Sequence, residues 1–183
     1  YGGQGAGAPY VLSQITGAWQ DTPDFLATQH TIETKADCEA YLARLEAFPR
    51  VMDQEIEHCR RDASLGVIPP DFAIRGAIRG LKTLRADPDT STLISSLTER
   101  AGAKGIAGSW GAQAKQIYID KVVPAIDRQI ALMEGLLPTA THDAGVWKLP
   151  DGDAYYAASL AYLTTTRMTP QEVHQLGLEV TKE

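Results

Sequence analysis

One apolar stripe constrains the fold of this 183-residue chain more than any other feature. After Thr34, apolar residues recur at alternating steps of four and three, the spacing that places them on one face of an α-helix. The stripe keeps its register through a proline, which predicts one long kinked helix, because proline lacks an N–H and crowds the preceding turn. Its members are Cys38, Leu42, Leu45, Pro49, Met52, Ile56, Cys59 and Ala63.

The two cysteines of the chain both lie on this stripe. Along a continuous helix, Cys38 and Cys59 would be roughly 31 Å apart at 1.5 Å per residue, whereas a disulfide needs Cα atoms closer than about 7 Å. A hairpin at Pro49 would instead allow them to meet. Because no Gly, Asn or Ser turn signal flanks Pro49, we favour the continuous helix and two free, half-buried thiols.

A second stripe predicts another long helix, from Ser109 to about Leu136, kinked at Pro124. The class is therefore all-α: a bundle of long kinked helices plus shorter ones, with one short strand near Val146–Leu149 left open. Shorter helical segments are expected at Val11–Trp19, ended by a turn at Asp21–Pro23, at Pro23–His30, from Asp71 to the breaker at Asp87, and from Thr90 or Ser91 to Ala101.

Two glycine-rich stretches are interpreted as loops. Tyr1–Pro9 is expected to be a flexible lead, and residues 10–183 to form a single helical region. This first stretch does not match the nucleotide-binding motif G-x-G-x-x-G. Tyr10 stands where the third glycine is needed, and no strand precedes the stretch. Between Gly102 and Gly111 a mobile loop is favoured over a phosphate loop, since Lys104-Gly105 reverses the required order.

Charge and hydropathy exclude some partners. The net charge of -6 argues against nucleic acid and anionic membrane, both of which select for basic surface. The sequence contains no run of 18 apolar residues, so no membrane span is predicted. The chain opens at Tyr1 without a methionine, and we expect it to be a processed or trimmed fragment of a longer chain.

The residues that could carry chemistry form no local catalytic motif. The four histidines, His30, His58, His142 and His174, are far apart, and no H-E-x-x-H occurs. No metal ligand and no catalytic residue is therefore predicted in this chain. We expect His58 to lie on a solvated helix surface.

The C-terminal stretch has the densest aromatic content. A breaker cluster, Pro150–Asp153, precedes an apolar-periodic helix that should fray at Thr164, and Thr169-Pro170-Gln171-Glu172 predicts a capping box that begins the next helix. Amphipathic rings beside a Pro-Gly loop suit the wall of a cleft, although aromatics at helical spacing are usually core. For His174 the alternatives are helix packing and a direct role in a site. The aromatics in question are Trp147, Tyr155 and Tyr156.

Three segments resemble the DUF885 family of bacterial, zincin-like, metallopeptidase-related proteins. The segment from Gly145 to Val180 resembles the family's GVW-LPDG-xYY and TTT…TP-E-(I/V)H-LGL-E motifs. The segment from Pro9 to Pro49 is similar to its PY-V-Q-GA, PDFL-QH-IET-AD and YL-RL motifs, and Gly66–Phe72, GVIPPDF, resembles its G-VPP-F turn. The resemblance covers most of the chain, in order.

The resemblance implies a function that composition and periodicity do not supply. Family members are several times longer, and their zinc-binding sequence lies downstream of the matched segment. The resemblance therefore implies the N-terminal helical, substrate-cleft-wall region of a zinc metallopeptidase-like hydrolase, with zinc held in the missing C-terminal region and a peptide as substrate. The substrate-binding candidates are Trp147, Tyr155, Tyr156 and His174.

An alternative function is a non-catalytic helical scaffold or binding module. In either case the first expected partner is the remainder of the parent chain, and exposed helix faces left by truncation could associate into a homodimer. Family members often look exported, so the resemblance also implies a periplasmic protein or lipoprotein.

Overall fold

The computed structural model describes residues 9–182, and all regular secondary structure in that range is helical, which confirms the all-α class. The α-helices are α1 (Ala18–Asp24), α2 (Lys35–Ser64), α3 (Asp71–Leu84), α4 (Thr92–Ala103), α5 (Trp110–Ile117), α6 (Val123–Leu136), α7 (Gly152–Thr164) and α8 (Pro170–Val180). Short π-helical or 3-10 segments are η1 (Phe25–Gln29), η2 (Pro88–Thr90), η3 (Tyr118–Val122), η4 (Leu137–Thr139) and η5 (Val146–Lys148). Apart from Pro9, the predicted flexible lead lies outside the described residues.

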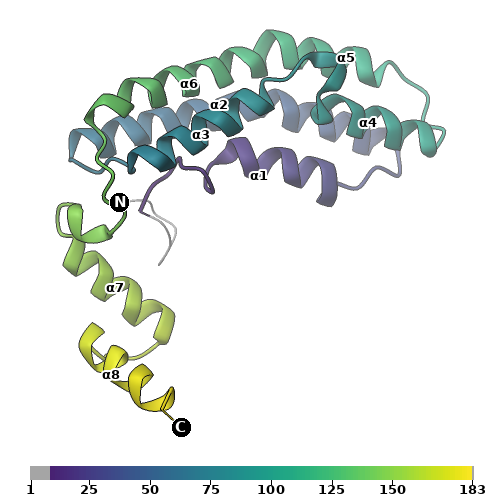
Figure 1. The fold of residues 1–183 in the computed structure, drawn as a ribbon. Helices are drawn as coiled ribbons and strands as arrows, with labels where there is room; N and C mark the ends of the chain where they lie inside the picture. The colour runs from purple at the N-terminus through teal and green to yellow at the C-terminus, as the bar shows by residue number, and fades with distance from the viewer. Residues whose placement is uncertain (1–8, 183) are drawn as a thin grey trace.

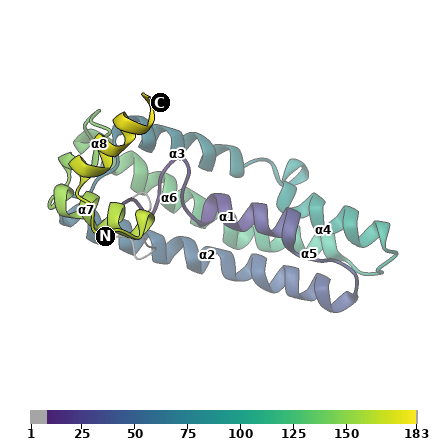
Figure 2. The same ribbon diagram turned by 90° about the horizontal axis from the view of Figure 1, so that it is seen from below.

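Helices α1 to α6 form an elongated bundle, and α7 and α8 project from one end of it (Figure 1). Helix α2 packs on α6 along the bundle, while α3 packs on α6 and α1. Helices α4 and α5 contact each other at the end of the bundle opposite the projecting pair (Figure 2). We call α7 and α8 together the arm.

Helix α2 is the continuous helix that its stripe predicts. Thr34 caps it: its hydroxyl accepts from the Asp37 N–H at 3.3 Å, and the Asp37 carboxylate accepts from the Thr34 N–H at 2.8 Å. Pro49 lies inside the helix, as expected. Cys38 and Cys59 are both free, and both are buried rather than half-buried.

The second long helix is also continuous, but its winding changes in the middle. Helix α5 passes through the π-helical segment η3 directly into α6. Pro124 follows this segment and has no N–H to offer the carbonyl of Asp120, four residues earlier. A local π-helical turn is a usual way for a helix to accommodate a disrupted hydrogen-bond ladder.

The expected first helix is wrong. Val11–Trp19 was expected to be helical, but the helix begins only at Ala18 and runs through Pro23 instead of ending at a turn there. The Ser13 hydroxyl accepts from the Ile15 N–H at 3.2 Å, and the Thr16 hydroxyl donates to the Tyr10 carbonyl at 3.1 Å, which gives the backbone an alternative to helix.

Gly17, which directly precedes α1, explains why this helix begins at Ala18. Gly17 has a φ of 120°, a conformation that a residue with a side chain rarely adopts. A Cβ there would also lie 2.7 Å from Leu12. The strand left open at Val146–Leu149 is wrong as well, because η5 occupies this position.

The apolar core is divided into two clusters along the bundle. The larger cluster joins α2 to α4, α5 and α6, and the smaller lies at the end where the arm begins. The buried side chains of the smaller cluster are Leu12, Cys59, Ile74, Ala77, Ile78 and Met133. The fully buried side chains of greatest volume in the larger cluster are Tyr41, Tyr118 and Phe48.

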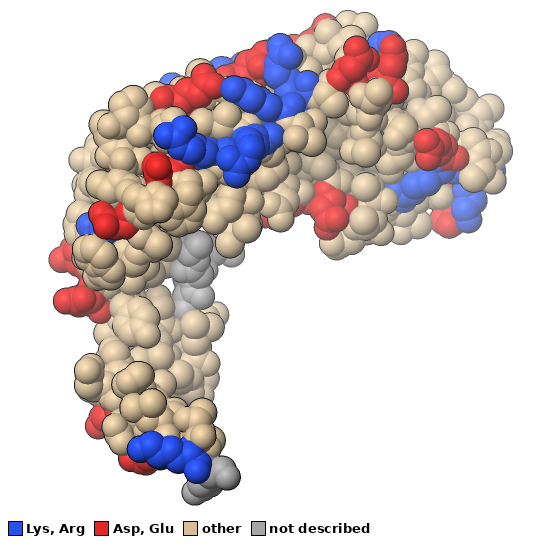
Figure 3. Space-filling model, in the orientation of Figure 1, with Lys and Arg blue, Asp and Glu red and all other residues tan. Residues whose placement is uncertain are grey.

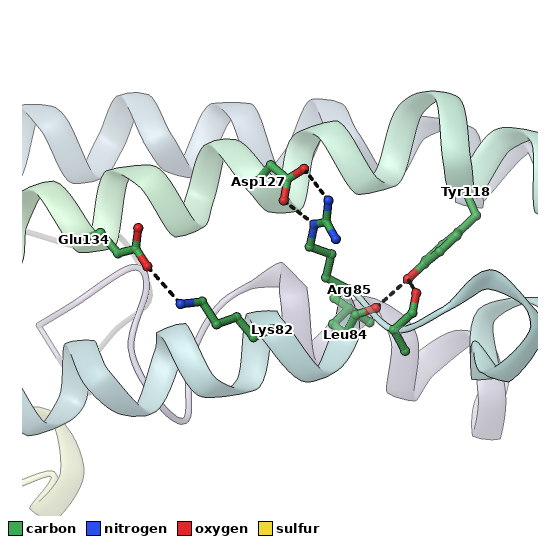
Figure 4. A network of polar contacts seen from close by, with 7 residues as sticks. Lys82, Leu84, Arg85, Tyr118, Asp127 and Glu134 are labelled. Atoms are coloured by element: carbon green, nitrogen blue, oxygen red, sulfur yellow. Dashed lines mark hydrogen bonds and ion pairs between the residues drawn. The ribbon is translucent and has the colours of Figure 1, made fainter.

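Polar contacts fasten α3 to the second long helix (Figure 4). Lys82 donates to Glu134 at 3.0 Å, and the Arg85 guanidinium forms a two-point ion pair with Asp127. The Tyr118 hydroxyl lies 2.7 Å from the Leu84 carbonyl and 2.9 Å from the Ala86 carbonyl. The exposed ion pairs contribute little each, roughly 0–1 kcal/mol, whereas the buried tyrosine hydroxyl fixes the end of α3.

A half-buried carboxylate joins three elements of the bundle. Glu55 of α2 accepts from the Ala18 N–H at 2.7 Å and from the Gln129 side-chain amide at 2.8 Å. The same amide donates to the Met52 carbonyl at 3.2 Å. Burial, the largest cause, raises the pKa of Glu55 despite these hydrogen bonds.

The raised pKa predicts a pH dependence of stability. The folded chain holds the Glu55 proton more tightly than the unfolded chain, so this group's contribution is fully present below its unfolded pKa, about 4.3. It is lost as the pH rises through the higher folded pKa. We expect Glu55→Gln to remove this component from the free energy of unfolding, measured by urea denaturation between about pH 4 and pH 7. Glu57→Gln, on the exposed side of the same helix, should keep the wild-type slope.

Candidate functional site

A compact turn from Gly145 to Gly152 positions the predicted aromatic residues. Its backbone is closed by hydrogen bonds from the Leu149 N–H to the Val146 carbonyl at 2.9 Å and from the Gly152 N–H to the Leu149 carbonyl at 3.0 Å. Leu149 is buried and anchors the turn. We call residues 145–152 the aromatic turn, because Trp147 lies at its centre.

Both glycines of this turn permit close approaches that a side chain would prevent. A Cβ at Gly152 would lie 2.1 Å from the Val146 carbonyl oxygen, and one at Gly145 would lie 2.1 Å from the Trp147 ring nitrogen. Pro150 packs on Gly66, at the turn between α2 and α3, where a Cβ would lie 3.3 Å from the proline ring. The aromatic turn is therefore folded tightly on itself and joined to the bundle.

The three aromatic candidates differ in their surroundings. Trp147 has 68% and Tyr156 has 50% of its surface exposed, whereas Tyr155 is half-buried. Tyr155 lies close enough to Tyr10 to influence the pKa of its phenol. Burial is the largest cause of the raised pKa of Tyr10, and the nearby Tyr155 phenol is the second. Trp147 and Tyr156 thus offer aromatic surface to solvent, while Tyr155 lies near the segment that precedes α1.

His174 lies apart from these aromatics, on α8. The predicted capping box is present: the Thr169 hydroxyl accepts from the Glu172 N–H at 3.3 Å, and the Glu172 carboxylate accepts from the Thr169 N–H at 2.7 Å. These hydrogen bonds lower the pKa of Glu172. His174 itself is exposed, and α8 makes at most sparse contact with the other described elements.

Helix α7 has unusual backbone conformations at both ends. Asp151 precedes it with a φ of 55°, and Thr165 follows it with a φ of 54°. For a β-branched residue such as threonine this left-handed conformation is an outlier. Asp151 stands at the N-cap position, yet its side chain makes no capping hydrogen bond.

The other histidines have structural surroundings. His30 is buried, and its Nδ1 lies 2.8 Å from Arg44 Nη1, which can only donate, so Nδ1 accepts. Its Nε2 then donates to the Asp37 carbonyl at 2.9 Å. His58 is exposed on α2, as predicted. Within residues 9–182, no three His, Cys, Asp or Glu side chains come together in a way that could hold a metal ion.

A histidine–aspartate pair near the base of the arm was missed from the sequence. His142 Nδ1 lies 2.7 Å from Asp71 Oδ1, and this hydrogen bond is the largest cause of the lowered pKa of Asp71. Burial lowers the pKa of the neighbouring Lys148. The two partners are far apart in the chain, and no local motif marks either of them.

A shallow groove of about 580 Å³ lies between α2 and the second long helix, at the level of their prolines. Its charged groups largely neutralise one another: Arg128 donates twice to Asp53, at 2.8 Å each, and Lys121 pairs with Glu46. No sequence motif indicates this groove. Its lining residues are Glu46, Pro49, Arg50, Asp53, Gln54, Glu57, Asp120, Lys121, Pro124 and Arg128.

The described residues thus define an all-α bundle with an exposed aromatic turn and a projecting two-helix arm. The chain belongs to the DUF885 family, bacterial proteins of unknown function, whose family model matches residues 2–183. No curated protein matches it. In the described residues, no helix is both long and apolar enough to cross a bilayer.

A solved structure shares this fold. It is described as a putative lipoprotein from Colwellia psychrerythraea, and it superposes with a TM-score of 0.87 at 24% sequence identity. The match covers 93% of this chain but only 30% of that chain. The present chain therefore spans less than a third of this solved relative.

The aromatic turn provides a matched pair of glycine substitutions. We expect Gly152→Ala to open the turn, because the new methyl group would lie 2.1 Å from a backbone oxygen that cannot move cheaply. The expected cost is about 1–3 kcal/mol, the usual cost of overpacking. Amide hydrogen exchange of residues 146–164 should become faster. In Gly177→Ala, where a Cβ meets nothing within 4 Å, these amides should keep wild-type rates, and α8 should gain up to about 1 kcal/mol.

Proposed function

We propose that this chain is the N-terminal helical region of a longer, zinc-dependent, peptidase-like hydrolase, and that its aromatic turn lines the substrate cleft. The observation that carries the proposal is the exposure of Trp147 on a tightly folded turn and of Tyr156 on the first part of α7, which follows it. Rigid amphipathic rings give a large contact area at little entropic cost, which suits the binding of an extended peptide. Tyr155 and His174 complete the proposed substrate-binding set.

The described residues do not themselves fit a zinc ion. Both ring nitrogens of His30 are engaged in hydrogen bonds, and His142 is paired with Asp71. His58 and His174 lie on separate helices, α2 and α8. We therefore assign any zinc to a part of the longer chain outside these residues, and give the bundle and the aromatic turn a binding role only.

Two features of the solved relative support parts of this proposal. Because the match covers only 30% of that chain, the solved protein has room for a metal site outside the matched helices. The description of the relative as a lipoprotein supports export of the parent protein, as a periplasmic or lipid-anchored form. A non-catalytic scaffold remains the competing function, and it predicts a parent without zinc.

The decisive measurement is the zinc content of the longer protein, purified without added metal, by elemental analysis. We expect about one zinc per chain and cleavage of a mixed peptide library read by mass spectrometry. The 183-residue chain alone should cleave nothing, and turnover by it would contradict the proposal. A longer protein that neither contains nor takes up zinc would favour the scaffold.

The cleft role of the aromatic turn has its own test in the longer protein. Trp147→Ala and Tyr156→Ala should each lower kcat/KM by about tenfold, because removing an aromatic contact at the centre of a binding surface commonly costs more than 1 kcal/mol. The zinc content should not change. Val51→Ala, which truncates an exposed apolar side chain on α2, is the matched control. Full activity in both aromatic variants would exclude the turn from the cleft.

A further inference from the structure

The arm carries large apolar side chains that nothing in the described chain covers. Helix α8 has no buried residue, and in α7 only Gly152 is buried. The large apolar side chains toward the far part of the arm expose between 42% and 68% of their surface. We call these the arm surface: Tyr162, Leu163, Leu176, Leu178 and Val180.

The pattern of α8 indicates that one of its faces is built for packing. Val173, Leu176 and Val180 follow at steps of three and four, so they share one face of the helix. Gln175 and Glu179, which bond each other at 2.9 Å, lie beside this face, and Leu178 lies on the opposite side of the helix. On the face shown in the space-filling view, the arm has few charged side chains, whereas the bundle carries several groups of both signs (Figure 3).

Helix α8 also needs a partner for its stability. It has 11 residues, and an isolated helix shorter than about 12–15 residues is marginal in water even with good caps. The capping box contributes about 1 kcal/mol, which does not replace the burial of an apolar stripe. The helix therefore has a defined beginning and an apolar face, but no core.

We propose that the arm surface is a docking site for the part of the longer chain that follows α8. In the solved relative, 70% of the chain (100% less the 30% that is matched) lies outside the matched region, so ample polypeptide exists to cover the arm. A following segment is tethered at α8 and acts at a high effective concentration, which favours it over a second copy of the chain. This inference requires a longer chain but no hydrolase activity.

Amide hydrogen exchange on the 183-residue chain and on the longer protein tests this proposal. We expect the α8 amides to exchange at least tenfold more slowly in the longer protein. Equal exchange in the two forms would overturn the proposal. Slow α8 exchange in the 183-residue chain, accompanied by concentration-dependent dimerisation in light scattering, would also overturn it. A second copy of the chain would then occupy the arm surface. Protection that requires phosphatidylglycerol vesicles would overturn it in favour of a lipid surface.

A matched pair of substitutions in α8 makes the same test specific to the face. Leu176→Asp should restore fast α8 exchange and lower the melting temperature in the longer protein only. Gln171→Asp puts the same charge on an exposed position in the first turn, where the helix dipole favours it, and should neither speed α8 exchange nor lower the melting temperature. If Leu176→Asp had no effect on the longer protein, the arm surface would not be a docking site. A longer protein that lacks zinc and activity would still give the expected exchange result, so this proposal can fail or hold independently of the proposed function.

Discussion

Burial of one face of α2 is the interaction on which the bundle depends. Helices α1, α4, α5 and α6 all pack directly on α2. The stripe supplies buried side chains to both core clusters, from Cys38 in the larger to Cys59 in the smaller. Each large apolar side chain that is fully buried contributes roughly 1.5–3 kcal/mol. Helices α3 and α6 also contribute buried side chains to both clusters, and together the three helices join the clusters into one body.

The polar groups inside the bundle serve to fasten helices. Tyr41 donates to the Leu93 carbonyl at 3.1 Å, and Tyr118 reaches the end of α3. Burial raises the pKa of Tyr41 to about 12 and that of Cys59 to about 12, so neither group readily ionises. His30 and Glu55 are held by hydrogen bonds from several elements. Buried polar side chains whose hydrogen-bonding groups are already engaged stabilise the bundle. They are not available to bind a ligand or to act in catalysis.

The part of the fold that could be predicted from the sequence depends on local patterns. Helix periodicity located α2 and the second long helix, and the capping boxes at Thr34 and Thr169 are each complete within four residues. The first helix was misplaced because its beginning depends on the positive φ of Gly17 and on its contact with Leu12, which no local propensity encodes.

The candidate site was less predictable for a similar reason. The sequence indicated Trp147, Tyr155 and Tyr156 as a group, but it could not tell an exposed ring from a core ring, because α7 is apolar on all sides and has no preferred face. His142 meets Asp71 because the chain after α6 passes the start of α3. The two residues are far apart in the sequence, so no local spacing predicts their contact.

The helices of the arm differ from those of the bundle in where their apolar residues lie. In α2 the apolar face is buried and the polar face meets water, whereas in α8 the apolar stripe meets water and the helix is defined by its cap alone. The aromatic turn at its base is tightly folded, since its glycines permit close contacts that a side chain would prevent. Pro150 joins this turn to the bundle at Gly66, and the two uncovered apolar helices follow it. That arrangement suits a docking surface for the part of the longer chain that follows α8. Trp147 and Tyr156 would then lie between the bundle and this docked segment.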